Sequence, residues 1–225
     1  MRTNPYIPFP SKILDVIKHT KKEYTFKMEF YGDVKPGQFF EVSIPKFGEA
    51  PISVSGITDN SVDLTIRKVG RVTDEVFENY IGDTLFLRGP YGNGFDIGKY
   101  TDGECVVVAG GTGVSPVRGV INALAASADS KDKHVILGFR SPSDMLFRDD
   151  IARWEKNMDL ILTMDKEAEG YTGNVGLVTK YIPDLKLKNV ETAQAVVVGP
   201  PAMMKFSVIE LLKRGLKEEN IWVSY

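Results

Sequence analysis

The hydrophobic pattern of this 225-residue chain changes its period near the middle. In the first part, β-branched and aromatic residues alternate with polar ones, as Val62, Leu64 and Ile66 do with their neighbours. Such alternation predicts half-buried strands. Turn-forming pairs such as Pro36-Gly37 and Gly82-Asp83 separate five or six of them, which favours an antiparallel barrel or sandwich. The expected strands are residues 12–20, 24–32, 38–44, 51–57, 61–69 and 83–89.

A short helix interrupts this series of strands. Residues 73–80 (TDEVFENY) have helical spacing, and Thr73 or Asp74 is expected to cap the helix at its N-terminus.

The second part of the chain alternates strands with helices. Val117, Val120, Ile121 and Leu124 recur at helical spacing, and a similar pattern after residue 200 stops at Gly215. The apolar strands are residues 104–109, 134–139, 160–164, 195–199 and 221–224. Such alternation predicts a parallel sheet covered on both faces. We therefore expect an antiparallel barrel or sandwich domain over residues 1–98 and a parallel-sheet α/β domain over residues 99–225.

A glycine-rich loop follows the first strand of the α/β domain. Gly110, Gly111, Thr112 and Gly113 precede Val114-Ser115-Pro116. The glycines allow a ligand to approach the backbone, while Ser115 as N-cap and Pro116 as first helical residue would begin a helix. A helix N-terminus binds anions through its free N–H groups. The loop matches neither the GxGxxG fingerprint nor a Walker loop, so by itself it is either a phosphate site or a tight structural turn.

Ligands of open α/β sheets bind at the carboxyl ends of the strands, so the residues that follow each strand are site candidates. Two more strand ends carry such residues. Asp165 follows one strand, and Gly199-Pro200-Pro201 follows another. An acidic residue there can accept hydrogen bonds from a ribose and repels a 2′-phosphate. The alternative for Asp165 is a solvated loop residue.

Composition excludes several classes of function. The net charge of -2, with 28 basic and 30 acidic residues interspersed, argues against nucleic acid as a partner. No apolar run approaches the roughly 18 residues that span a bilayer, and the N-terminal residues lack a signal core, so we expect a cytoplasmic protein without a membrane partner. With one cysteine and two histidines, no metal site is expected.

The remaining chemically capable side chains are expected to be structural. Cys105 lies in an apolar strand and is predicted to pack in the core, and His19 and His134 flank strands as surface or structural residues. Trp154 and Trp222 are interpreted as packing residues.

The order of a barrel, a GGTG loop and a GPP loop resembles the ferredoxin–NADP reductase superfamily. In that superfamily an N-terminal barrel holds a flavin and an α/β domain holds a nicotinamide nucleotide. The motifs that carry the resemblance are GEAPISVSG (48–56), LTIRKVGRVTDEVF (64–77), LRGPYGNGF (87–95), VVVAGGTGVSPVRGVIN (106–122), GYTGNVGLVTKYIP (170–183) and VVVGPPAMMKF (196–206). Together they look like the electron-transfer subunit of anaerobic sulfite reductase, with sulfhydrogenase gamma subunits and dihydroorotate dehydrogenase electron-transfer subunits as close relatives.

The resemblance implies two flavin-binding stretches in the barrel. The first is Pro51, Ile52 and Ser53, with Ser53 as the candidate catalytic hydrogen-bond partner of the flavin. Ala50 stands where the superfamily has a phosphate-binding arginine, and Arg67 or Arg71 is a candidate to replace that charge. The second stretch is Thr65, Ile66 and Arg67, followed by a pyrophosphate-binding turn that includes Gly70, Val72 and Thr73. This turn favours FAD over FMN.

The resemblance also implies nicotinamide-nucleotide contacts in the α/β domain. Gly110, Gly111, Thr112 and Gly113 would take the pyrophosphate, with Thr112 as the catalytic candidate closest to the nicotinamide. Arg140 would lie along the adenosine half of the nucleotide, while Gly199 and Pro200 would border the nicotinamide. NADPH-using relatives place Ser-Arg where this chain has Asp165-Lys166, so NADH is favoured over NADPH.

The function that the resemblance implies is hydride transfer from NAD(P)H to FAD, followed by single-electron transfer to iron–sulfur and siroheme subunits of a redox complex. Relatives continue into a cysteine-rich tail that ligates a [2Fe–2S] cluster, and those ligands are not in these 225 residues. In plant-type reductases a terminal tyrosine covers the flavin, which makes Tyr225 a candidate for that position. The alternatives are a self-standing NAD(P)H–flavin diaphorase or flavodoxin-type reductase, and a flavin-less nucleotide-binding regulatory module.

Overall fold

A computed structural model of the chain describes residue 4 and residues 6–224, which form two compact units. The division falls between Phe95 and Asp96, inside the turn-rich segment that follows the last predicted barrel strand. Tyr225, the candidate flavin-covering residue, lies outside the described residues.

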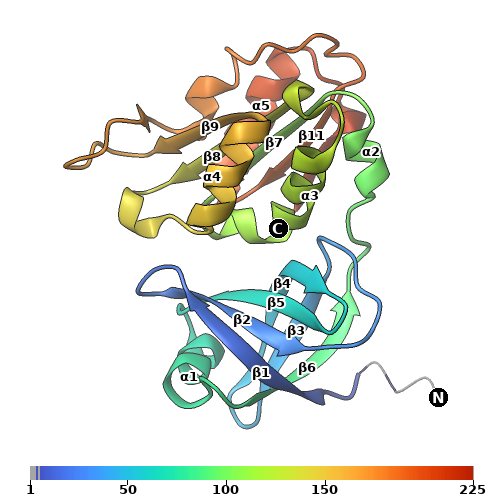
Figure 1. Cartoon of the computed structure of the whole chain (residues 1–225), viewed down its shortest axis with the longest axis vertical. Helices are drawn as coiled ribbons and strands as arrows, with labels where there is room; N and C mark the ends of the chain where they lie inside the picture. Colours follow the sequence, from blue (N-terminus) through green and yellow to red (C-terminus); the bar gives the residue numbers. More distant parts are fainter. Residues whose placement is uncertain (1–3, 5, 225) are drawn as a thin grey trace. The chain divides into compact units, whose positions relative to one another are not determined.

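The first unit is a closed antiparallel barrel with strand order β1-β2-β5-β4-β3-β6 (Figure 1). Its strands are β1 (Phe9–Lys18), β2 (Glu23–Glu29), β3 (Phe39–Ile44), β4 (Gly48–Thr58), β5 (Ser61–Arg67) and β6 (Thr84–Tyr91). The sequence pattern is compatible with both a barrel and a sandwich. Antiparallel pairing of Phe9–Lys12 in β1 with Thr84–Leu87 in β6 closes the sheet and makes it a barrel.

The interior of the barrel is filled by every second residue of its strands, as the alternating pattern predicts. Phe26, Met28, Phe40, Leu64 and Ile66 are completely buried there. Each large apolar side chain removed from water stabilises the fold by about 1.5–3 kcal/mol, so this core orders the strands that carry the predicted flavin contacts.

Helix α1 (Arg71–Asn79) begins earlier than the sequence predicts. Gly70 is its N-cap residue, so the prediction that Thr73 or Asp74 occupies this position is wrong. Thr73 lies at the third helical position, and its Oγ1 accepts hydrogen bonds of 3.0 Å from the N–H groups of Val69 and Gly70. The threonine therefore still satisfies the start of the helix, but from inside its first turn.

The second unit is a six-stranded parallel sheet with strand order β10-β9-β8-β7-β11-β12 (Figure 1). Its strands are β7 (Cys105–Gly110), β8 (Lys133–Phe139), β9 (Asp159–Met164), β10 (Asn174–Val175), β11 (Gln194–Val198) and β12 (Ile221–Ser224). The sequence predicts all of these except β10. That strand has two residues and pairs only with the end of β9, so it is too short to leave a hydrophobic pattern.

Helices cover both faces of this sheet, as predicted. Its helices are α2 (Ile97–Thr101), α3 (Val114–Ala126), α4 (Arg148–Asn157) and α5 (Pro201–Lys213). In Figure 1, α3 and α4 lie in front of the sheet. Met204 and Leu211 of α5 pack with Val106 and Val108 of β7 on the other face. Because both faces are covered, β7 is buried along its whole length.

Candidate functional site

The chain changes direction across the parallel sheet between β7 and β11. From β7 it continues to β8 and β9 on one side, whereas β11 and β12 lie on the other side. Parallel pairing sets Val198, the last residue of β11, beside Ala109 of β7. Open α/β sheets bind their ligands beyond the carboxyl ends of strands at such a switch point. The structure therefore brings the glycine loop and the Gly199-Pro200 loop together there.

Gly113 lies against the end of β11. A Cβ atom on Gly113 would stand 2.7 Å from the carbonyl carbon of Val198 and 2.9 Å from the Cα of Gly199. A Cβ on Gly110 would stand 2.5 Å from Sδ of Met203. These two glycines thus permit the two loops and α5 to pack together, a role that the sequence pattern did not predict.

Gly111 has a different environment. Its φ angle is +57°, in the left-handed region, and no atom lies within 4 Å of where its Cβ would be. This glycine combines a backbone conformation that L-residues avoid with open space beside it. Gly111–Gly113 form a short 3₁₀ turn that leads into α3, and Thr112 in this turn is partly buried.

Helix α3 begins at Val114 with Gly113 as its N-cap residue, so the prediction of Ser115 as the cap and Pro116 as the first helical residue is wrong. Pro116 is still tolerated, because the first four N–H groups of a helix have no acceptor within it. Ser115 is 3% exposed, and its Oγ has no hydrogen-bond partner among the described residues. A buried hydroxyl without a partner costs about 1–3 kcal/mol, so a ligand atom that bonded it would be favoured.

Arg140 and Asp165 lie at the same edge of the sheet. Arg140 directly follows β8 and Asp165 directly follows β9, and the backbone N–H of Asp165 donates to the carbonyl oxygen of Phe139 at 2.9 Å. Both side chains are exposed. Pairing of Gly138 with Gly110 connects this part of the edge to the glycine loop. The arrangement leaves both interpretations of Asp165, ribose acceptor and solvated loop residue, open.

In the barrel, the β4 candidates differ in where their side chains lie. Ile52 packs against the barrel core, whereas Pro51 is exposed and Ser53 is partly buried on the opposite side of the strand. Ser53 pairs with Phe39 of β3, which pairs in turn with Tyr91 of β6. Ser53 is thus next to an aromatic pair on the outside of the barrel.

The side chains of the β5 candidates Thr65, Ile66 and Arg67 mainly contact other protein groups. Ile66 is completely buried, and Oγ1 of Thr65 lies 2.7 Å from the hydroxyl oxygens of both Thr25 and Ser55. The guanidinium Nε of Arg67 is 3.1 Å from a carboxylate oxygen of Glu23. A cofactor beside this strand would therefore meet its backbone rather than the side chains of Thr65 and Ile66.

The first turn of α1 has the features of an anion site. The first three N–H groups of a helix lack acceptors within it, Val72 and Thr73 are buried, and Gly70 has open space where a side chain would begin. Arg71 is exposed beside this turn. One of its nitrogens donates to the carbonyl oxygen of Lys46, which leaves other N–H donors of the guanidinium for an anion. Arg71 is therefore a better replacement for the arginine missing at position 50 than Arg67, which Glu23 neutralises.

One arrangement in the barrel has no counterpart in the sequence predictions. Arg88 of β6 binds both carboxylate oxygens of Glu49, with bonds of 2.5–2.9 Å, and donates at 3.0 Å to the hydroxyl of Tyr91. Arg88 lowers the pKa of Glu49, and the carboxylate raises the pKa of Arg88. The sequence contains both members of this ion pair, Glu49 in GEAPIS and Arg88 in LRGPYG. Only the closed sheet places them side by side.

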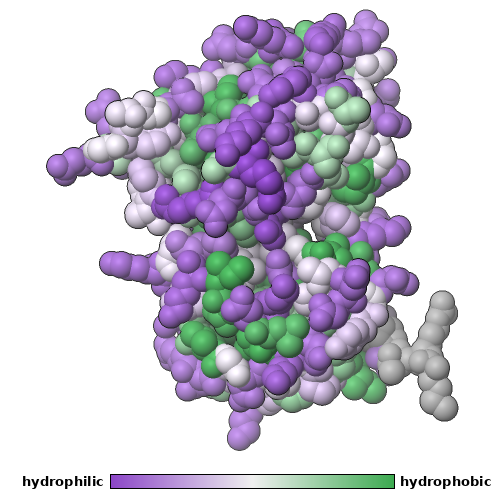
Figure 2. Space-filling view, in the orientation of Figure 1, coloured by the Kyte–Doolittle hydropathy of each residue, from purple (hydrophilic) through white to green (hydrophobic). Residues whose placement is uncertain are grey.

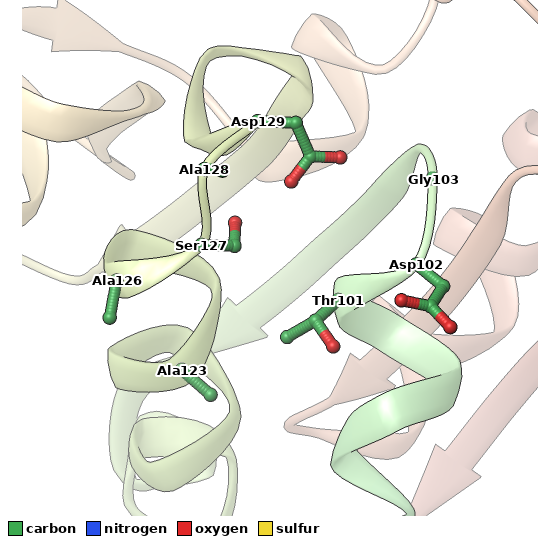
Figure 3. A pocket seen from close by; sticks show the side chains of 8 residues that line it. All are labelled: Thr101, Asp102, Gly103, Ala123, Ala126, Ser127, Ala128 and Asp129. Atoms are coloured by element: carbon green, nitrogen blue, oxygen red, sulfur yellow. The ribbon is translucent and has the colours of Figure 1, made fainter.

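A buried lysine, Lys133, lies at the opposite ends of the parallel strands, where it begins β8. The ammonium group of Lys133 is completely buried and donates to the carbonyl oxygens of Thr101 and Gly103 and, at 2.8 Å, to Asp129. Its three acceptor residues line a hollow of about 620 Å³ between the ends of α2 and α3 (Figure 3). Because three acceptors hold the ammonium group, its role is to join β8 to these helix ends.

His134 and Trp222 were predicted as a surface or structural residue and as a packing residue, respectively. His134 lies inside β8, 4% exposed, with Nδ1 at 2.8 Å from Asp159, which confirms the structural alternative. Trp222 is 47% exposed and has the Lys99 ammonium 4.4 Å from its ring centroid, so it is not a core residue. Trp154 and Cys105 are completely buried, as predicted.

Within residues 4 and 6–224, no group of three or more His, Cys, Asp or Glu side chains is arranged to hold a metal ion. No helix in the same part of the chain is both long and apolar enough to cross a bilayer.

Comparison with known proteins places this geometry in a family. Residues 107–208 match the model of the oxidoreductase NAD-binding domain. The whole chain is similar to the sulfhydrogenase 2 gamma subunit of Pyrococcus furiosus, with 33% identity covering 98% of this chain and 84% of that relative. It is also similar to the dihydroorotate dehydrogenase B (NAD(+)) electron transfer subunit of Clostridium perfringens, with 29% identity covering 96% of this chain and 82% of the relative.

Solved structures share the complete two-unit fold. The ferredoxin reductase of carbazole 1,9a-dioxygenase superimposes with a TM-score of 0.82 and 22% identity, covering 96% of this chain and 68% of that one. The NADH-dependent reduced ferredoxin–NADP oxidoreductase superimposes with a TM-score of 0.79 and 24% identity, covering 100% and 78%. The chain belongs to the ferredoxin–NADP reductase-like family of NAD-binding oxidoreductases. Its relatives include sulfhydrogenase gamma subunits and dihydroorotate dehydrogenase electron-transfer subunits.

Proposed function

We propose that this chain is the NADH-oxidising, FAD-containing electron-transfer subunit of a multi-subunit redox enzyme. The observation that carries the proposal is the switch point between β7 and β11. There an open left-handed Gly111 and the N-terminus of α3 lie beside the Gly199-Pro200 loop, and the first turn of α3 carries the unpartnered hydroxyl of Ser115. The full-length similarity to subunits of sulfhydrogenase and dihydroorotate dehydrogenase supports the same function.

The nucleotide is proposed to bind with its pyrophosphate on the glycine loop. Backbone N–H groups of this loop and of the first turn of α3 donate to the phosphate oxygens, and Thr112 lies on the nicotinamide side. Gly199 and Pro200 border the nicotinamide ring, and Arg140 extends along the adenosine half. Asp165 accepts hydrogen bonds from the adenosine ribose and repels a 2′-phosphate, so NADH is preferred over NADPH.

The barrel is proposed to bind FAD. The first turn of α1, with Gly70, Val72 and Thr73, holds the pyrophosphate, and Arg71 provides the cation that Ala50 lacks. Pro51, Ile52 and Ser53 border the flavin ring, with Ser53 as its hydrogen-bond partner. The flavin, when bound, accepts a hydride and passes electrons on one at a time, and the protein positions the rings and tunes their electronics.

Anaerobic sulfite reductase is the proposed complex, with iron–sulfur and siroheme subunits as partners. Six motifs that occur in the order found in the electron-transfer subunit of that enzyme support this proposal. The ligands of the [2Fe–2S] cluster that relatives carry are not among these residues, which contain one cysteine.

The proposed function is tested with the purified chain and added FAD under anaerobic conditions. The expected results are a yellow protein with a 1:1 content of FAD and bleaching of the flavin spectrum by NADH faster than by NADPH. A protein that stays colourless with FAD would refute the redox function. It would favour the regulatory-module alternative, which the absence of the phosphate-binding arginine at Ala50 suggests. Copurification with siroheme and iron–sulfur polypeptides separates the sulfite reductase proposal from a self-standing diaphorase.

A further inference from the structure

Helix α5 is apolar on both of its sides. Its inward side is buried at Met204 and Leu211, as in any helix that covers a sheet. Its outward side carries Phe206, Ile209 and Leu212, which are 55%, 37% and 41% exposed. A helix on a protein surface usually turns charged and polar residues outward, so this apolar ridge needs a separate explanation.

The apolar surface continues beyond the helix. Leu177 is 62% exposed and lines a hollow of about 420 Å³ together with Thr179, Lys180, Phe206 and Glu210. We call Leu177, Phe206, Ile209 and Leu212 the α5 ridge. Exposed apolar residues that gather in one place mark interaction surfaces, whereas scattered ones need no explanation. By contrast, the outer surface of the α/β unit on the side of α3 and α4 is mainly hydrophilic (Figure 1 and Figure 2).

The charges around the α5 ridge are predominantly positive. Lys213 is neutralised by Glu210 at 2.7 Å, whereas Lys180 and Lys205 have no ion-pair partner among the described residues. The Lys205 ammonium lies 6.0 Å from the ring centroid of Phe206, and that of Lys180 donates to the carbonyl oxygen of Val175 at 3.2 Å. Both cations therefore border the apolar surface without a carboxylate of their own.

This charge pattern selects the kind of partner. In a two-fold pairing of identical copies the same patch meets itself, so the lysines of one copy would face apolar surface and lysines of the other. Like charges brought together oppose such an assembly, whereas carboxylates on a different polypeptide would pair with both lysines. Phe206 and Leu177 would form the desolvated centre of that interface, and the lysines its polar rim.

We propose that the α5 ridge is a docking surface for a second polypeptide of the redox complex, which presents an apolar ridge flanked by carboxylates. The inference rests on the proposed function in one respect, namely that the chain works as a subunit. The ridge lies on the side of α5 that faces away from the parallel sheet. The glycine loop and the Gly199-Pro200 loop lie beyond the strand ends of that sheet, so the partner leaves both of them accessible.

The first experiment compares two double variants of the tagged full chain in the native complex, isolated through the tag. Phe206→Ser with Ile209→Ser is expected to lower the recovery of the partner polypeptide about tenfold or more, as loss of central interface residues does. The matched control is Glu155→Ser with Lys156→Ser, two exposed positions on α4, and it is expected to recover the complex in full. Full recovery with the ridge variant, or equal loss with the control, would overturn the proposal.

The second experiment identifies what lies on the ridge. Cys105 is buried, so Phe206→Cys creates a single accessible thiol for a short photoreactive crosslinker, with Glu155→Cys as the control position. The proposal expects a crosslink from position 206 to a different polypeptide, close to Asp or Glu residues in its sequence. A crosslink to a second copy of this chain, or no crosslink from position 206, would overturn it.

A final comparison separates this proposal from the proposed function. The isolated ridge variant is expected to bind FAD and to be reduced by NADH at the wild-type rate, because the ridge is outside both cofactor sites. If the wild-type chain fails to bind FAD while the ridge variant still loses its partner, the redox function is refuted and the docking surface stands. If both activities persist and the complex stays intact, the docking surface is refuted instead.

Discussion

The carbonyl carbon of Val198 lies 2.7 Å from the position that a Cβ atom of Gly113 would occupy. The glycine loop after β7 and the end of β11 therefore fit only because residue 113 has no side chain. This contact joins the two loops of the candidate nucleotide site, which makes it both a packing constraint and a determinant of the geometry of the site.

Gly113→Ala is expected to destabilise the protein by about 1–3 kcal/mol, because the backbone must move to accommodate the methyl group. It is also expected to weaken NADH binding, since the two loops separate. Chemical denaturation and fluorescence titration measure the two effects. Gly98→Ala is the control, with only an ordinary contact at 3.5 Å, and should change stability by less than about 0.5 kcal/mol. Equal stability of both variants would show that the loop relaxes freely.

Ser115→Ala is expected to weaken NADH binding about five- to tenfold without lowering the stability of the free protein. The hydroxyl is buried and unpartnered in the free chain, so its removal costs no hydrogen bond there but costs one in the complex. Ser207→Ala removes another completely buried hydroxyl without a partner, on α5, and should leave NADH affinity unchanged. If the two variants bind NADH alike, Ser115 has no part in the site.

The double variant Asp165→Ser with Lys166→Arg is expected to raise kcat/KM for NADPH relative to NADH about tenfold or more, a change of about 1.4 kcal/mol. The carboxylate that repels a 2′-phosphate is removed and a guanidinium that binds it is added. Glu169→Ser, an exposed change in the same loop, is the control. An unchanged ratio of the two kcat/KM values would assign Asp165 to the solvated surface.

Lys133→Met is expected to destabilise the protein by about 2–4 kcal/mol, because two backbone carbonyl groups lose their donor. Asp129→Asn should have a much smaller effect, since that carboxylate is 43% exposed and screened by water. Urea denaturation provides both values. A Lys133→Met protein as stable as the wild type would show that water replaces the ammonium group.

The Lys133 ammonium lowers the pKa of Asp129, so this pair also has a pH dependence of definite sign. A carboxyl group whose folded pKa is depressed stabilises the fold above its unfolded pKa of about 3.9 and loses that contribution as the pH falls through the folded value. The difference in stability between the wild type and Asp129→Asn should therefore be present at neutral pH and disappear in acid. A difference that grows towards low pH would have the wrong sign for this pair.

The thiol of Cys105 is expected to be inert in the folded protein. Burial raises its pKa to about 12, so thiolate is scarce at neutral pH, and the sulfur is shielded from reagents. Reaction with a thiol-specific chromogenic disulfide should proceed only at the rate of unfolding and become immediate in denaturant. Fast labelling of the native protein would indicate that the end of β7 opens.

Much of the fold could be read from local patterns. Alternation at Val62, Leu64 and Ile66 predicts a barrel strand, and the apolar run before Gly110 predicts a strand buried on both faces, because in each case neighbours in the sequence carry the signal. The strand ends at Gly110, Asp165 and Gly199 were predictable as site candidates for the same reason.

Helix boundaries and the contacts of individual side chains were harder to predict. Thr73 and Ser115 have the residue types of N-caps, yet both lie inside the first turn of a helix, because the preceding glycines take the cap position. His134 is enclosed by β8 and its neighbours, and no local pattern distinguishes it from a surface histidine.

The sequence by itself determined the element types, the order of antiparallel and parallel sheet, and the strand ends that are candidates for ligand binding, since these follow from residue size, polarity and spacing along the chain. Only the tertiary structure decided that Gly113 serves the packing of β11, that Arg88 binds Glu49, that Thr65 is held by Thr25 and Ser55, and that α5 keeps an apolar side uncovered. Each of these depends on residues that are distant in sequence and adjacent only after the sheets form.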